Sequence, residues 1–160
     1  MIEIVFLDVD GCLTDGKIIY SPHGEIKEFD VKDGFGIEGW LKLGKKVAII
    51  TKRNSPRVEE RARDLKISYV FQGVKDKLKT AEEILKKENL SLENAAAIGD
   101  DYNDQVLLSK VKRSFKPNDA THGLLVQTTL THNGGNGAIR EMIEILMKEN
   151  GIFEDWVKVW

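Results

Sequence analysis

Short apolar runs and amphipathic segments alternate along most of the chain. Runs that are apolar throughout and rich in β-branched residues or alanine are typical of strands buried on both faces. Such runs lie at 2–7, 47–50, 69–71 and 95–98, and two weaker strand candidates lie at 111–115 and 125–128. Between them, apolar residues at helical spacing and helix-start signals predict helices at 34–43, 54–65, 75–87, 101–108 and 138–148.

The alternation of strands and helices predicts an α/β fold. Successive βαβ units imply a doubly wound, Rossmann-like and mostly parallel sheet with helices on both faces. Two short β-like runs at 17–20 and 25–29 flank Pro22-His23-Gly24 and predict a small β-hairpin extension at about 16–30. We expect residues 1–160 to form a single domain that ends in a tail at about 151–160.

Composition and charge narrow the classes of function. The chain has 160 residues, of which 41% are hydrophobic and 31% charged, and its net charge of -2 offers no basic field for a nucleic acid or a membrane surface. No apolar run is long enough for a transmembrane helix, and the N-terminal run carries an acid and no positive region, which predicts a cytoplasmic protein. The one cysteine, Cys12, is expected to be a small buried hydrophobe.

Acidic residues directly follow two of the predicted buried strands. Asp8 and Asp10 come after the first strand, on the same side of an extended segment. Asp100-Asp101 comes after the fourth strand, and Asp104 lies one helical turn beyond. These acids are expected to converge, because ligands bind at the carboxyl ends of strands in such sheets. Mg²⁺, a hard cation with oxygen ligands, would offset their repulsion beside a phosphate. For Asp101 alone, capping of the next helix is an equal alternative.

Two further side chains complete a predicted phosphate site. Thr51, after the second strand, can donate its hydroxyl to a phosphate oxygen, and Lys77 supplies a compact positive charge. A carboxylate nucleophile needs no deprotonation at neutral pH, and a second acid can protonate the leaving alkoxide and then activate water. Asp8 and Asp10 fit these two roles, which predicts a phosphatase that forms an aspartyl-phosphate on Asp8.

A resemblance to a known family agrees with this chemistry. The segment Asp8-Val9-Asp10-Gly11-Cys12-Leu13-Thr14 resembles the first motif of the haloacid dehalogenase superfamily, and Thr51, Lys77 and Gly99-Asp100-Asp101 follow in the order of its other three. The chain further resembles a capless subfamily, the phosphatases of 3-deoxy-D-manno-octulosonate 8-phosphate (KDO 8-phosphate). The segments that carry this second likeness are 16–29, 32–36, 72–73 and 134–141.

The resemblance implies a role for each residue at a motif position. Asp8 would be the nucleophile, Asp10 the acid and base, and Thr51 and Lys77 would hold the phosphate. The metal ligands would be Asp8, Asp10 (through its backbone carbonyl) and Asp100. The substrate-binding residues would be Asp10, Lys32, Asp33, Gly34, Arg53, Arg61 and Asn103. The resemblance also implies Mg²⁺ as cofactor, a sugar-acid phosphate as substrate, a homotetramer, and a place in lipopolysaccharide precursor synthesis.

The sequence leaves alternatives for the substrate and for the class of function. Lys52 stands where the family commonly has glycine, so a nine-carbon sugar-acid phosphate or another small phosphate ester is a second candidate substrate. A phosphoacceptor signalling domain also places acids, a threonine and a lysine around Mg²⁺ in a doubly wound sheet. Such domains lack an acid two residues after the acceptor, so Asp10 favours a phosphatase.

A site without a cap domain needs another way to exclude water and select a substrate. Only a hairpin and one helix fit between Asp10 and Thr51, and only one helix fits between Lys77 and Asp100. A neighbouring subunit is the simplest answer, with the hairpin and the aromatic tail as candidate contact elements. For the tail, packing on its own domain is an equal alternative.

Overall fold

The computed structural model describes residues 1–160. Its strands are β1 (Ile4–Leu7), β2 (Ile19–Ser21), β3 (Gly24–Ile26), β4 (Lys46–Ile50), β5 (Tyr69–Phe71), β6 (Ala95–Ile98), β7 (Arg113–Lys116) and β8 (Thr128–Thr129). Its helices are α1 (Val31–Lys42), α2 (Pro56–Asp64), α3 (Lys77–Lys87), α4 (Gln105–Leu108), α5 (Ala138–Glu149) and α6 (Phe153–Lys158). An irregular turn with non-helical backbone angles at Asp10 and Gly11 lies at η1 (Val9–Leu13), and single helical turns lie at η2 (Leu92–Asn94) and η3 (Tyr102–Asp104).

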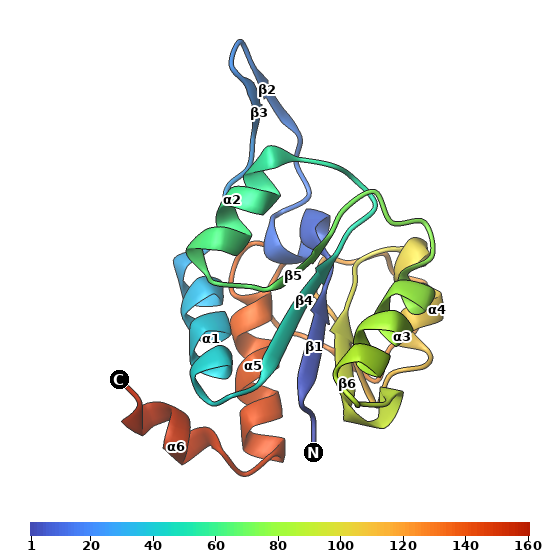
Figure 1. The fold of residues 1–160 in the computed structure, drawn as a ribbon. Coiled ribbons are helices and arrows are strands. Elements are labelled where there is room, and N and C mark those ends of the chain that lie inside the picture. Colours follow the sequence, from blue (N-terminus) through green and yellow to red (C-terminus); the bar gives the residue numbers. More distant parts are fainter.

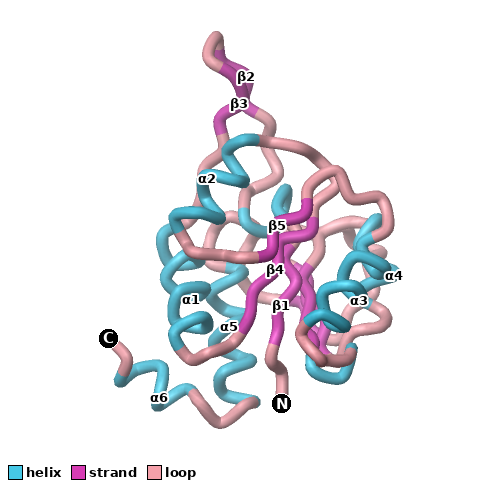
Figure 2. The backbone as a smooth tube through the Cα atoms, in the orientation of Figure 1, coloured by secondary structure: helices cyan, strands magenta, loops and turns pink.

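Six strands form one sheet in the order β5-β4-β1-β6-β7-β8, and every neighbouring pair is parallel. β1 lies in the middle, where Phe6 pairs with Ala48 of β4 and Ala97 of β6. The sheet lies between α1, α2 and α5 on one face and α3 and α4 on the other (Figure 1, Figure 2). The predicted doubly wound α/β fold is therefore confirmed.

Side chains of β1 alternate between two hydrophobic layers, as strand geometry requires. Val5 and Leu7 pack in the layer that α1, α2 and α5 cover, whereas Ile4 and Phe6 pack in the layer under α3 and α4. All four side chains are at most 1% exposed. The strand is thus held on both faces, and its carboxyl end, where Asp8 follows, is fixed by the packing of the core.

Side-chain caps determine where two helices near the site begin. The Asp30 carboxylate accepts hydrogen bonds from the backbone N–H groups of Lys32 and Asp33, so α1 begins at Val31, earlier than the predicted position 34. The Ser55 hydroxyl accepts from the N–H of Arg57 and is followed by a proline, so α2 begins as the sequence predicts.

Three other elements are shorter than predicted. The hairpin pairs Ser21 with Gly24 across a two-residue turn, and only three residues of each strand pair. The strand expected at 125–128 is reduced to β8, because Leu125 is 75% exposed and packs in neither layer. The helix expected at 101–108 is divided, because Asp101 caps η3 and the longer turn begins only at Gln105.

The aromatic tail packs on its own chain. Trp156 of α6 is buried against α1, and a Cβ on Gly39 would lie 1.7 Å from the Trp156 indole nitrogen. Trp160 stacks on Phe35 at 3.9 Å between ring centroids, with the Lys42 ammonium over its ring. α6 lies at the end of the molecule opposite the hairpin (Figure 1). Within one chain the tail therefore packs on its own domain, which was one of its two expected positions, and it lies away from the carboxyl ends of the strands. None of the helices combines the length and the hydropathy needed to cross a membrane.

Candidate active site

A pocket of about 470 Å³ opens where β1, β4 and β6 end. Its lining residues are Asp8, Asp10, Gly16, Thr51, Lys52, Arg53, Asp100, Asp101, Tyr102 and Asn103. The structure thus brings together the acids, the threonine and the arginine that the sequence placed after separate strands. Tyr102 and Gly16 are additional lining residues that had no sequence signal of their own.

The turn after β1 brings two acidic segments together. The Asp8 N–H still donates to the Ile98 carbonyl of β6, and the chain then turns sharply through Gly11, whose φ is +90°. A Cβ at Gly11 would lie 2.0 Å from an Asp100 carboxylate oxygen. Glycine is required there both for its left-handed conformation and for its missing side chain. Asp100 can therefore approach the first motif closely.

Lys77 is a buried cation between two carboxylates. Its ammonium lies 2.7 Å from Asp8 Oδ1 and 2.5 Å from Asp104 Oδ1, and its side chain is 3% exposed. Burial alone would lower the pKa of Lys77, but the charges of Asp8 and Asp104 outweigh burial and raise it. The lysine is therefore charged at neutral pH and fixed in place. Lys77 lies at the start of α3, and its burial shows that it is not an ordinary surface lysine.

Asp104 organises the loop after β6. Its second carboxylate oxygen accepts from the backbone N–H groups of Asp100 and Asp101, at 3.1 and 3.4 Å, and the side chain is buried. Asp104 thus connects the Asp100 loop to Lys77. The sequence indicated that Asp104 lies near the site. It did not indicate that Asp104 accepts hydrogen bonds from both the Asp100 loop and Lys77, because these contacts depend on the loop conformation.

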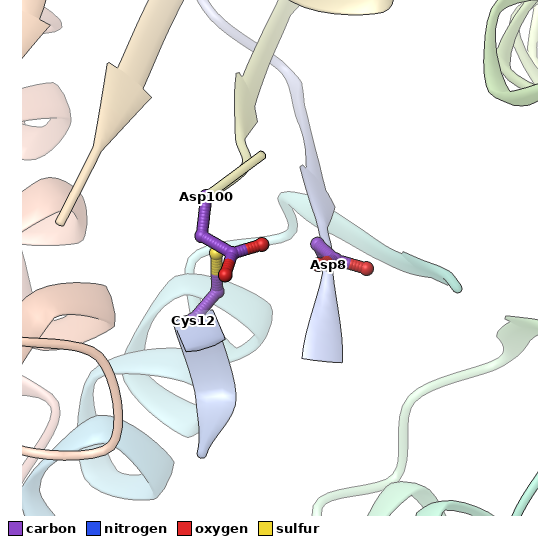
Figure 3. Close-up of side chains that lie close together, drawn as sticks. All are labelled: Asp8, Cys12 and Asp100. Atoms are coloured by element: carbon purple, nitrogen blue, oxygen red, sulfur yellow. The ribbon is translucent and has the colours of Figure 1, made fainter. Parts of the chain in front are cut away.

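Asp8 and Asp100 form the acidic floor of the pocket, with Cys12 beside them (Figure 3). One ligand atom of each lies within 4.8 Å of the others. Burial raises the pKa of Asp8 to about 6, with Lys77 opposing the rise, and burial together with the charge of Asp8 raises the pKa of Asp100 to about 8. Ionisation of both carboxyl groups is therefore costly in this desolvated site, and a cation bound between them would offset that cost.

The donor set favours a hard cation. Burial and the neighbouring acid Asp8 raise the pKa of the Cys12 thiol, so Cys12 stays protonated, whereas the thiolate is the form that binds soft metals. Cys12 is fully buried, as expected for a small hydrophobe. The available donors are carboxylate oxygens, which are the ligands that Mg²⁺ prefers.

Asp10 points away from this acidic floor toward the hairpin. Its Oδ1 lies 2.5 Å from the ammonium of Lys27, and its Oδ2 lies 3.8 Å from a guanidinium nitrogen of Arg53. Arg53 also donates to Glu25 of the hairpin at 2.8 Å. The sequence predicted Asp10 and Arg53 in the site but gave no signal for Lys27 or Glu25, because the hairpin folds back onto the pocket only in three dimensions.

Thr51 and Lys52 follow β4 at the pocket wall. Thr51 is 2% exposed, and its backbone is fixed by hydrogen bonds to Phe71 and Val74. Lys52 is exposed at the pocket edge, and it is not among the non-glycine residues with positive φ. The turn therefore needs no glycine at this position, and the consequence of Lys52 is an added positive charge.

The remaining predicted substrate residues do not line the pocket of this chain. Asp33 is 1% exposed, and its Oδ1 accepts a hydrogen bond from the N–H of Arg140 in the first turn of α5. Gly34 lies under Arg61, which donates to the Asp30 carbonyl. Lys32 lines a separate hollow beside Arg140. In a single chain these residues lie on the α1, α2 and α5 side of the molecule, and their contact with substrate stays a prediction.

Asp33→Asn is expected to change how stability depends on pH. Burial raises the pKa of Asp33 to about 6 although backbone N–H groups of α5 oppose the rise. The folded state thus holds a proton that the unfolded state has released, so this contribution to stability is present below about pH 4 and is lost as the pH rises through the folded-state pKa. As the pH rises from about 4 to 7, we expect the free energy of unfolding of the wild type to fall by about 2 to 3 kcal/mol relative to that of the variant.

Denaturant titrations of both proteins across this range measure the difference. All other titrating groups are common to both proteins, so the comparison isolates Asp33. Parallel pH profiles would show that the carboxyl titrates alike in the folded and unfolded states.

Comparisons with known proteins show which family the chain resembles. A family model for haloacid dehalogenase-like hydrolases matches residues 70–133. The 3-deoxy-D-manno-octulosonate 8-phosphate phosphatase KdsC of Salmonella typhi is 39% identical over 158 residues, which are 96% of this chain and 84% of that protein.

Solved structures give the same answer over nearly the whole chain. One such structure is the KDO 8-phosphate phosphatase of Moraxella catarrhalis in complex with a magnesium ion, a phosphate ion and a KDO molecule. It matches this protein with a TM-score of 0.94 at 35% sequence identity, and the match covers 99% of this chain and 92% of that chain. The cobalt-bound phosphatase of Haemophilus influenzae has a TM-score of 0.90 at 35% identity, with 95% and 91% covered. With this fold, these strand-end acids and this extent of identity, the chain belongs to the 3-deoxy-D-manno-octulosonate 8-phosphate phosphatase family of the haloacid dehalogenase-like hydrolases.

Proposed function

We propose that this protein hydrolyses KDO 8-phosphate to KDO and inorganic phosphate. The observation that carries the proposal is the likeness, over nearly the full length, to a phosphatase with magnesium, phosphate and KDO bound. The geometry supports it independently, since Asp8, Asp10 and Thr51 line one pocket and Lys77 binds Asp8. A place in lipopolysaccharide precursor synthesis is part of the same proposal.

The reaction divides into two steps at Asp8. First, an Asp8 carboxylate oxygen forms a bond to phosphorus as the bond to the sugar oxygen breaks, and the Asp10 carboxyl gives that oxygen a proton. Water then gives a proton to the Asp10 carboxylate and attacks phosphorus, and the Asp8–phosphorus bond breaks to release phosphate. The Asp10 carboxyl group gives up a proton in the first step and regains one in the second, so it returns to its protonated starting state in each cycle.

Lys77 and Thr51 would hold the phosphoryl group during both steps. Lys77 neutralises charge at the attacking carboxylate, and the Thr51 hydroxyl can donate to a phosphoryl oxygen. Mg²⁺, which Asp8, the Asp10 carbonyl and Asp100 would hold, supplies positive charge that offsets the charge of the transferred group. Arg53 and the exposed Lys52 add positive charge at the pocket edge, where the carboxylate of a sugar acid can bind.

Two alternatives are separated by specific observations. A nine-carbon sugar-acid phosphate remains the second candidate substrate, because Lys52 gives the pocket edge a charge that glycine would not. A phosphoacceptor signalling domain is disfavoured, because the pocket contains an acid two residues after Asp8 and the full-length relatives are phosphatases.

A panel of phosphate esters tests the proposal. With Mg²⁺ present, we expect KDO 8-phosphate to give a kcat/KM at least about 100-fold above that of glucose 6-phosphate, since a matched carboxylate contact adds about 2 to 3 kcal/mol of transition-state binding. Treatment with EDTA should abolish turnover, and Mg²⁺ should restore it. A nine-carbon ester that exceeds the eight-carbon one would favour the second candidate, and equal values for all esters would refute a sugar-acid substrate.

We further infer a homotetramer whose neighbouring subunit closes the pocket. The hairpin projects from the body of the molecule (Figure 1), and two strands alone are marginally stable in water. Ile18, Ile19, Tyr20 and Ile26 on it are exposed, Tyr20 by 82%, which favours a protein contact there. Sedimentation equilibrium of the wild type and of Tyr20→Ser should show a tetramer that the substitution weakens, and a monomeric wild type would refute it. The cytoplasmic location predicted from the sequence stays a prediction.

A further inference from the structure

The stem of the hairpin carries a lysine that turns back into the pocket. Lys27 follows β3, and its side chain is only 1% exposed. Lysine is almost never fully buried unless it is paired with an acid. The partner of Lys27 is Asp10, at 2.5 Å, with Glu25 of β3 at 3.7 Å. The buried charge of the hairpin is therefore paired with the acid and base of the reaction.

The Asp10 carboxylate is held from two directions. Lys27 faces Oδ1 at 2.5 Å, and Arg53 faces Oδ2 at 3.8 Å. Glu25 joins the two cations, since it binds Arg53 at 2.8 Å and Lys27 at 3.7 Å. Lys27 is the closer and more buried partner, because the Arg53 side chain is 39% exposed. The orientation of Asp10 is thus determined mainly by Lys27.

We propose that Lys27 is a positioning residue for the phosphatase reaction: its ammonium holds the Asp10 carboxylate where Asp10 can serve the leaving group and the attacking water. The inference rests on the proposed function. It makes the hairpin part of the catalytic apparatus within its own chain, in addition to the subunit contact inferred above. Lys27 itself touches neither the phosphorus nor the nucleophile.

The effect of Lys27 should be confined to the steps that use Asp10. A displacement of about 1 Å of a catalytic group can cost about 100-fold in rate. With p-nitrophenyl phosphate, the leaving nitrophenolate needs no proton, so only the second step, in which water gives its proton to Asp10, depends on the position of Asp10. Loss of Lys27 should therefore slow release of phosphate from Asp8 but spare formation of the phosphoenzyme.

Lys27→Met tests this with p-nitrophenyl phosphate and Mg²⁺. We expect kcat to fall about 10- to 100-fold with kcat/KM changed less than about 3-fold, because kcat/KM reports formation of the phosphoenzyme and KM falls with kcat when only the second step is slowed. Stopped-flow traces should show a burst of nitrophenolate that matches the enzyme concentration. Lys17→Met is the matched control, because Lys17 is 78% exposed and pairs only with Asp15. It should retain wild-type kinetics. Lys27→Arg, which keeps the charge, should recover most of kcat.

A double-mutant cycle shows whether Lys27 acts through Asp10. In an Asp10→Asn background, adding Lys27→Met should lower kcat less than about 3-fold, because the group that Lys27 positions is gone. An equal loss in both backgrounds, or a raised KM with kcat unchanged, would overturn the proposal. The cycle also distinguishes a folding defect from a loss of positioning, since the double variant has no unpaired acid at residue 10. Circular dichroism checks that each protein is folded. A wild type inactive on every ester would instead refute the proposed function.

Discussion

Asp8→Asn is expected to lower kcat by at least about four orders of magnitude, because an amide oxygen cannot form the phosphoenzyme. The fold should survive. Asp8 is buried, and Lys77 keeps its second partner, Asp104, at 2.5 Å. Removal of a carboxylate whose pKa burial raises to about 6 also removes a desolvation cost at neutral pH. We therefore expect a melting temperature close to that of the wild type.

Phosphate release from KDO 8-phosphate or p-nitrophenyl phosphate measures the loss of activity. When the phosphoryl group of the substrate is labelled and the reaction is quenched with acid, the wild type should yield a labelled phosphoprotein and the variant none. Asp155→Asn is a control, since Asp155 is exposed in α6, at the far end of the molecule. Substantial turnover by a folded Asp8→Asn would refute Asp8 as the nucleophile.

Lys77→Met is expected to lower both stability and activity. The substitution leaves Asp8 and Asp104 buried side by side without the cation that lies within 2.7 Å of both. Breaking a buried pair in this way costs about 3 to 5 kcal/mol, which corresponds to a melting temperature lower by about 6 to 20 °C in a chain of this size. Turnover should fall by about 1,000-fold or more, because positive charge at the transferred phosphoryl group is lost.

Calorimetry and steady-state kinetics measure the two effects separately. Lys79→Met on the same helix is the matched control, because Lys79 is exposed and a surface substitution changes stability by about 0.5 kcal/mol or less. A Lys77→Met protein with the wild-type melting temperature would show that the carboxylates do not depend on Lys77.

Local patterns were sufficient for the fold and for the inner part of the site. The period of apolar residues depends on neighbours a few positions away, so β1, β4 and β6 and the helices between them could be predicted. The carboxyl ends of parallel strands meet at one edge, so strand order and spacing were enough to place Asp8, Thr51 and Asp100 in one pocket. The boundaries were less certain, because caps such as Asp30 move a helix start by several residues.

The sequence by itself therefore determined a doubly wound phosphatase fold, and it predicts Asp8 as the nucleophile. Only the tertiary structure decided which side chains support that nucleophile and where the outer residues lie. Lys27 reaches Asp10 across the hairpin, Asp33 caps α5 at the other end of the chain, and Trp156 packs on Gly39. Each contact joins residues that are well separated in the sequence. Its energy comes from burial and pairing of groups that are brought together only by folding, so local sequence patterns cannot predict it.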